Sequence, residues 1–263
     1  MTGLPRKLLT RSTDFILLIV IIIVWEIVTS GLRIIPAYLF PSFSQVVSRL
    51  SSEVVSGKVL LAAAFSLYRF STSLMIGVFG GILVGWILGW YKLAYRIAAP
   101  LIYSLYPIPM ISLYGLFIIW VGLTDQAIIA VGAVTAFFQV LLNTITGVKD
   151  VDPILVRAAR DYGANDRQIA VKVVFPSAVP LIVAGFKLAV IGAFIVDVTA
   201  EMIFTPPYSS GLGWSVAFYA FIQNDPAGTL SALLVLAIVG GVIINFAEYL
   251  DKKAARWRRA IKE

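Results

Sequence analysis

The sequence predicts an all-α protein that crosses a membrane about six times, as one integral domain over residues 1–263. Of the 263 residues, 60% are hydrophobic and 13% are charged, whereas a soluble domain is roughly half apolar and about a quarter charged. The charges gather at the two ends and in short loops, between long apolar runs. Only helices and closed barrels span lipid, and these runs are too long and continuous for the alternating strands of a barrel.

A helix needs about 20 apolar residues to cross about 30 Å of hydrocarbon. The predicted spans lie near residues 14–32, 62–90, 98–121, 126–148, 178–203 and 228–250. The first span follows a basic stretch, as a secretory signal would. We expect it to be retained, because the later spans already require a membrane; cleavage after the small residues 28–30 is the alternative.

The basic residues predict the orientation, since positive loops stay in the cytoplasm. With the N-terminus inside, the inner loops and both tails hold sixteen Lys and Arg, and the outer loops hold three, Arg33, Arg49 and Lys58. We therefore expect a multi-pass inner-membrane protein with both termini, the loop 149–177 and the basic tail 251–263 in the cytoplasm. The net charge of +7 lies in tails and short loops, which argues against nucleic-acid binding.

A short amphipathic helix is expected on the outer surface at residues 44–56, after a proline-containing stretch that breaks helix. Its apolar stripe consists of Val46, Val47, Leu50 and Val54.

The composition also limits the chemistry. The chain has no cysteine and no histidine, which excludes thiolate nucleophiles, disulfides and most metal sites. It has no phosphate-binding loop of the form GxxxxGK[ST]. We therefore expect no catalytic residue, metal or cofactor on this chain. The pairs Gly80-Gly81 and Gly85-Gly89 are interpreted as close helix packing rather than as ligand sites.

The long inner loop, 149–177, has the pattern of two short helices joined by a glycine. Asp152-Pro153 provides a cap followed by a proline at the first helical position, and Gly163 stands where a left-handed turn ends a helix. Asn165 or Asp166 can cap the second helix, which Pro176 is expected to stop.

The first of these helices has an apolar face that combines small and large side chains. It consists of Ile154, Leu155, Ala158, Ala159 and Tyr162. Such a face suits docking against another protein, and packing against the protein's own helix ends suits it equally.

The spacing of Ala158-Ala159, Gly163 and Val173-Val174-Phe175-Pro176 resembles the EAA loop of binding-protein-dependent ABC importer permeases. That family pattern is Glu-Ala-Ala, three residues, Gly, nine residues, Ile, any residue, Leu, Pro. The spacing matches without a gap, but Arg157 replaces the family's Glu. The resemblance implies the fold of a type I ABC importer permease.

Five further segments resemble the nitrate, sulfonate, taurine and bicarbonate branch of this family by their order and spacing. They are Leu39–Val46, Pro107–Pro109, Phe117–Gly122, Ala200–Met202 and Ser209–Gly213.

By this resemblance the chain is a transport subunit and not an enzyme. Its partners would be a second permease copy, expected as a homodimer, a solute-binding protein outside, and an ABC ATPase that binds ATP and Mg. The residues that couple to the ATPase would be Arg157, Ala158, Ala159, Gly163, Ala164, Val173 and Pro176. Two other classes remain: an ATP-independent secondary transporter, and an integral-membrane enzyme limited to carboxylate chemistry.

Ionisable residues inside the spans are expensive to bury and are therefore candidates for function. They are Glu26, Arg69, Lys187, Asp197, Glu201 and Glu248. Asp197 and Glu201 share one helix face. Their carboxylates are expected either to form a structural ion pair with Arg69 or Lys187 or to contact the solute. The residues proposed for the translocation path or gate are Arg69, Tyr106, Pro107, Pro109, Trp120, Asp197 and Glu201.

Overall fold

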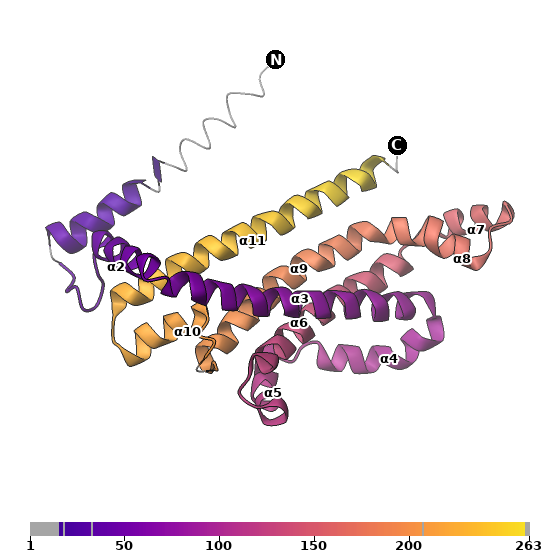
Figure 1. Cartoon of the computed structure of the whole chain (residues 1–263). Helices are drawn as coiled ribbons and strands as arrows, with labels where there is room; N and C mark the ends of the chain where they lie inside the picture. The colour runs from indigo at the N-terminus through magenta and orange to yellow at the C-terminus, as the bar shows by residue number, and fades with distance from the viewer. Residues whose placement is uncertain (1–15, 18, 33, 207, 261–263) are drawn as a thin grey trace, which may run out of the picture. The chain divides into compact units, whose positions relative to one another are not determined.

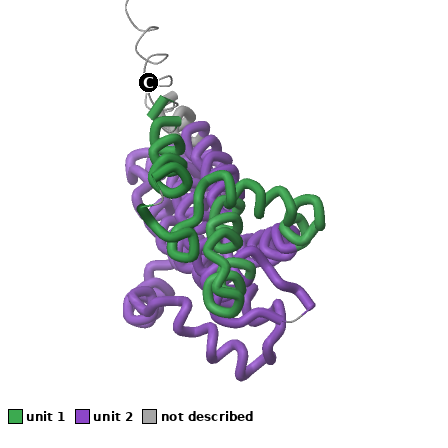
Figure 2. The backbone as a smooth tube through the Cα atoms, turned by 90° about the vertical axis from the view of Figure 1, so that its left-hand side faces the viewer, with its two compact units in different colours: residues 1–61, 215–235 green, residues 62–214, 236–263 purple. Residues whose placement is uncertain are grey.

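The computed structural model describes residues 16–260 apart from 18, 33 and 207, and this part of the chain consists of helices joined by turns, without a strand (Figure 1). It divides into two compact units, which Figure 2 colours separately. Unit 1 comprises residues 1–61 and 215–235, and unit 2 comprises residues 62–214 and 236–263. Each unit is described by itself below.

Within the described residues, four helical stretches are long and apolar enough to cross a membrane. They are α3 (Lys58–Trp90), α6 (Asp125–Lys149), the stretch Asp166–Ile203 that contains α9 (Phe175–Ile203), and the Pro226–Lys253 part of α11 (Pro226–Ala260). They confirm the spans predicted near 62–90, 126–148, 178–203 and 228–250.

The span predicted as one helix at 98–121 is broken. Helix α4 (Lys92–Leu105) is followed by the 3-10 turn η2 (Met110–Leu113) and by α5 (Tyr114–Val121), and the two arms are bent by 89°. Pro107 and Pro109 lie between the arms. Proline has no N–H and disfavours helix at the preceding residue, so the helix ends there.

Of the first predicted span, the structure describes an apolar helix at Ile19–Gly31, which includes the π turn η1 (Ile27–Gly31). The basic residues at its start, Arg6, Lys7 and Arg11, and the end of the basic tail lie outside the described residues.

In unit 2, helix α3 packs on α6 along a row of glycines. A Cβ atom built on Gly81, Gly85 or Gly89 would lie only 2.8, 2.7 and 2.6 Å from its nearest α6 atom. These distances are shorter than real side-chain contacts, so only glycine permits the approach of the two helices. The interpretation of this glycine row as a packing surface is confirmed.

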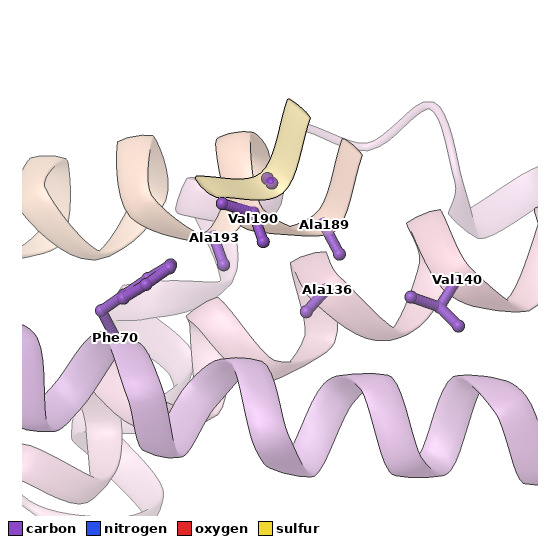
Figure 3. Packing of buried hydrophobic residues seen from close by; sticks show 7 residues of the cluster. Phe70, Ala136, Val140, Ala189, Val190 and Ala193 are labelled. Carbon is purple, nitrogen blue, oxygen red and sulfur yellow. The ribbon is translucent and has the colours of Figure 1, made fainter. Parts of the chain in front are cut away.

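Helix α6 also packs on α9 through small side chains (Figure 3). Ala136 and Val140 of α6 meet Ala189, Val190 and Ala193 of α9, with Phe70 of α3 closing the cluster. The three helices therefore form a tight core that fixes the positions of the side chains at both of its ends.

In unit 1, α2 (Phe43–Val55) begins with a capping box between Ser42 and Gln45. A helix is therefore present where the outer helix was predicted, and the residues of its predicted apolar stripe differ in burial. Val46 and Glu53 are buried, whereas Val47 and Val54 are exposed.

The carboxylate of Glu53 is buried because it has a polar partner in the second segment of unit 1. The hydroxyl of Tyr219, in the π turn η4 (Phe218–Ile222) after α10 (Leu212–Ala217), donates a hydrogen bond to Glu53. Burial and the Glu53 carboxylate raise the pKa of Tyr219. Arg49 forms an ion pair of 3.1 Å with Asp225 and lies over the Tyr219 ring, so this face of α2 is held by charge as well as by apolar contact.

Candidate functional site

The first helix of the loop, α7 (Pro153–Asp161), has the predicted ends. The Asp152 carboxylate accepts a hydrogen bond of 2.8 Å from the N–H of Ile154, and Pro153 occupies the first turn. Gly163 has a φ of +83°. The N–H of Gly163 donates to the carbonyl of Arg160 and the N–H of Ala164 to that of Ala159, at 2.9 and 3.0 Å. These are the two bonds of a Schellman motif, which requires a left-handed residue at this position.

The second helix begins as predicted and does not end where it was predicted to end. Asn165 and Gln168 form a capping box at the start of α8 (Asp166–Ile169). The chain then continues through the π turn η3 (Ala170–Val174) into α9, so the predicted stop at Pro176 is wrong. Pro176 lies in the first turn of α9. Because proline cannot donate to the hydrogen-bond ladder, the irregular π turn before it accommodates the gap without ending the helix.

The apolar face of α7 divides between the two alternatives left open by the sequence. Ala159, Ala164 and Val173 pack against the buried cluster around Val174 and Ile182 of unit 2. The larger side chains do not: Ile154 is 69% exposed, Leu155 47% and Tyr162 93%. Arg157 and Ala158 are exposed as well. On α7 itself, Val156 and Ala159 thus anchor the helix to its own unit, and Ile154, Leu155 and Tyr162 remain exposed.

At the other end of unit 2, a buried ion network surrounds Arg69 of α3. Its side chain is 0% exposed. All three guanidinium nitrogens donate hydrogen bonds: to Asp125 at 2.8 and 3.0 Å, to Glu201 at 2.7 Å, and to the hydroxyl of Ser209 at 2.8 Å. Asp125 is the first residue of α6, and Glu201 lies in the last turn of α9. The network therefore ties α3 and the ends of α6 and α9 to the segment that follows α9.

The Glu201 carboxylate accepts further hydrogen bonds besides the one from Arg69. The Ser66 hydroxyl donates to its carboxylate at 2.7 Å, and the N–H of Gly213 donates at 2.9 Å. The Ser66 oxygen in turn accepts from the N–H of Leu212 at 2.8 Å. Buried charges are tolerated only when they are paired and hydrogen-bonded in this way.

Asp197, one turn before Glu201, is equally buried and differently placed. Neither carboxylate oxygen has a hydrogen-bond partner among the described residues. The carboxylate packs against Gly132 of α6, where a Cβ atom would collide with it. The ion pair expected for these carboxylates is thus present between Glu201 and Arg69, and Asp197 has neither expected partner. Lys187 lies near Asp251 and Glu248 of α11 instead, at 3.6 and 3.9 Å.

The remaining path candidates do not join this network. All four are exposed: Tyr106, Pro107 and Pro109 lie at the bend between α4 and α5, and Trp120 lies near the end of α5. Sequence reasoning missed Asp125, Ser66 and Ser209. The only signal for Asp125 was its place at the start of a predicted span, where an acidic residue is ordinary for a helix N-terminus.

Comparison with known proteins decides the family. Residues 77–256 match the model of the family described as binding-protein-dependent transport system inner membrane component. The chain belongs to this family. The resemblance to ABC importer permeases is thereby confirmed, and with it a multi-pass permease of the inner membrane.

Two relatives of this permease are similar over most of their length. The putative aliphatic sulfonates transport permease protein SsuC of Bacillus subtilis is 28% identical over 92% of this chain and 86% of its own. The taurine transport system permease protein TauC of Escherichia coli is 27% identical over 93% and 89%.

Solved structures agree on the fold. A bacterial ABC transporter involved in the import of the acidic polysaccharide alginate has a chain that is 17% identical, with a TM-score of 0.65 over 94% of this permease and 98% of that chain. A chain of the MetNI methionine ABC transporter gives a TM-score of 0.59 at 19% identity over 72% and 94%. The permease has the type I importer fold.

Proposed function

We propose that this permease serves an ABC importer of small organic anions of the sulfonate class, of which alkanesulfonates and taurine are examples. Two relatives that align with most of the chain, the aliphatic sulfonates permease and the taurine permease, support this solute class. The further partners follow from the family: a solute-binding protein outside, an ATPase that binds ATP and Mg inside, and a second copy of this chain.

The ATPase is proposed to bind α7. The observation that carries this assignment is the exposure of Ile154, Leu155 and Tyr162 on a helix whose two ends are fixed by a cap and a Schellman motif. Exposed apolar side chains on a rigid helix are suited to a groove in another protein. Arg157 stands beside them, exposed and without an ion pair among the described residues, and would meet an acidic group of the ATPase.

The Arg69 network is assigned to the outer side, because the basic loops place α7 inside and the network lies at the other end of α3 and α9. The two buried carboxylates of Asp197 and Glu201 would repel an anion, and Glu201, like the half-buried Asp125, is already paired with Arg69. We therefore assign the network to closure of the outer gate and not to contact with the solute. The exposed Tyr106, Pro107, Pro109 and Trp120 remain candidates for the path between two copies.

The test is ATP-driven uptake of radiolabelled taurine in proteoliposomes that contain the permease, its ATPase and its binding protein. Ala158→Asp introduces a charge into the exposed apolar face, and Gly163→Pro removes a donor of the Schellman motif. Both should insert normally, and uptake and binding-protein-stimulated ATP hydrolysis should fall at least about tenfold. Ser51→Asp, which adds the same charge to the exposed surface of α2, is the control and should retain both.

Wild-type uptake that needs no ATP would overturn the importer proposal in favour of a secondary transporter. Normal coupling in Ala158→Asp and Gly163→Pro would overturn the assignment of α7 alone. ATP-dependent uptake of other solutes with no response to taurine or alkanesulfonates would remove only the solute class.

A further inference from the structure

A cavity of about 1050 Å³ opens at the end of unit 2 that carries α7. Its walls come from the end of α3, most of α4, the end of α6, α7 itself and the end of η3. This volume is at the upper limit of ordinary small-molecule pockets. No feature proposed above uses it.

Four cations line this cavity: Lys92, Arg96, Lys149 and Arg160, and no acidic residue lines it. Among the described residues, Lys92, Arg96 and Lys149 form no ion pair, and Arg160 pairs with Asp166 at 3.0 Å on the exposed surface. The Lys149 ammonium lies over the ring of Tyr95, 2.7 Å from its centroid. Like charges gathered in one concave site repel each other and raise the local concentration of anions.

The rest of the wall is apolar and aromatic. It includes Trp90, Pro100, Tyr103, Val148 and Val156. A bare inorganic anion would neutralise the cations and leave this surface in contact with water. A ligand that satisfies both parts of the wall has an anionic group joined to an apolar body.

We propose that this cavity binds an anionic amphiphile, with its phosphate or sulfonate group on Arg96 and Lys149 and its apolar body against Trp90 and Tyr103. Two sources supply that chemistry. One is an anionic phospholipid of the inner leaflet, because basic pockets between membrane helices on the cytoplasmic side suit such headgroups. The other is a free alkyl sulfonate or alkyl phosphate from the aqueous phase.

An occupant would also bear on α7, since Val156 and Arg160 belong both to the cavity wall and to that helix. Occupation of the cavity would restrain the helix that is proposed to seat in the ATPase. Binding itself depends on the lining residues alone, so it can be tested without any assumption about the transported solute.

The experiment uses the full chain in phosphatidylcholine nanodiscs, with binding measured for phosphatidylglycerol and, separately, for hexanesulfonate. The variant Arg96→Gln with Lys149→Gln removes two lining charges from two different helices, α4 and α6. The matched control, Arg167→Gln with Lys172→Gln, removes two exposed charges from the same end of the molecule outside the cavity. The wild type and the control should bind at least one probe, and the cavity variant should lose at least about tenfold in affinity.

The two probes separate the sources. If phosphatidylglycerol binds and hexanesulfonate does not displace it, the ligand is a lipid. If hexanesulfonate displaces phosphatidylglycerol, the ligand is a free alkyl sulfonate or alkyl phosphate. Equal binding by the wild type and the cavity variant, equal loss in the control, or no binding of either probe to the wild type overturns the proposal. If the double variant does not fold, Arg96→Gln alone, which truncates an exposed side chain, is judged by the same outcomes, and Arg96→Lys should retain binding.

Discussion

The two ends of unit 2 differ in how they satisfy their charged and apolar groups. Around Arg69, a fully buried guanidinium gives hydrogen bonds from all three nitrogens, to partners on two other helices and the segment after α9. Around α7, three large apolar side chains are exposed, and Lys92, Arg96 and Lys149 form no ion pair within the described chain. The groups that contact Arg69 find their partners within a single subunit. The α7 end leaves groups that another molecule would cover.

The difference indicates which end tolerates change. At the Arg69 end, each group depends on the others, and removing one leaves a buried charge without its partner. At the α7 end, the fold depends on the caps and on buried contacts such as those of Ala159, while the large exposed residues contribute little to the fold of this chain. Substitutions at the two ends should therefore separate stability from coupling.

The largest effect is expected for Arg69→Met. The substitution leaves Asp125 and Glu201 without their common partner, and breaking a buried pair costs about 3–5 kcal/mol. Denaturant unfolding of the purified chain in detergent measures the loss. Arg69→Met combined with Glu201→Met should recover part of it, because the second substitution removes one of the uncompensated charges. A loss below about 1 kcal/mol for Arg69→Met would show that the network is not a source of stability.

A smaller effect is expected next to Asp197. A Cβ atom in Gly132→Ala would collide with the Asp197 carboxylate in the buried core, and such overpacking costs about 1–3 kcal/mol. The control is Gly115→Ala in α5, where nothing lies within 4 Å of the new atom. It should be neutral or stabilising by up to about 1 kcal/mol, since alanine favours helix over glycine. Equal unfolding free energies for the two variants would contradict the close contact.

The smallest effect on stability is expected for Leu155→Ser at the α7 end. An exposed residue without a partner should change the free energy of unfolding by no more than about 0.5 kcal/mol, while binding of the ATPase weakens because an apolar contact is lost. Unfolding and a pull-down with the ATPase measure the two quantities on one preparation. Marked destabilisation would mean that Leu155 packs within its own chain, against the exposure on which the comparison rests.

Much of this fold was predictable from local chemistry. Apolar length fixed four spans, and the caps at Asp152 and Asn165 with the left-handed Gly163 fixed the helix–turn–helix of the loop. The stop at Pro176 was wrong, because a π turn before the proline continued the helix. The single span at 98–121 was wrong in its geometry, because Pro107 and Pro109 break the helix while the composition stays apolar throughout.

The positions of the membrane helices and the family indicated by the spacing of one loop could be predicted, since both depend on residues close together in the chain. Which carboxylates pair with Arg69 could not be predicted, because it depends on the packing of helices that are distant in the chain. Asp125 and Glu201 are 56 and 132 residues away from Arg69 along the chain, and Asp197 shares a helix face with Glu201 and is left unpaired. Helical periodicity states which face a side chain lies on. Which group lies opposite that side chain depends on how the three helices pack. The glycine row between α3 and α6 sets the distance between those two helices.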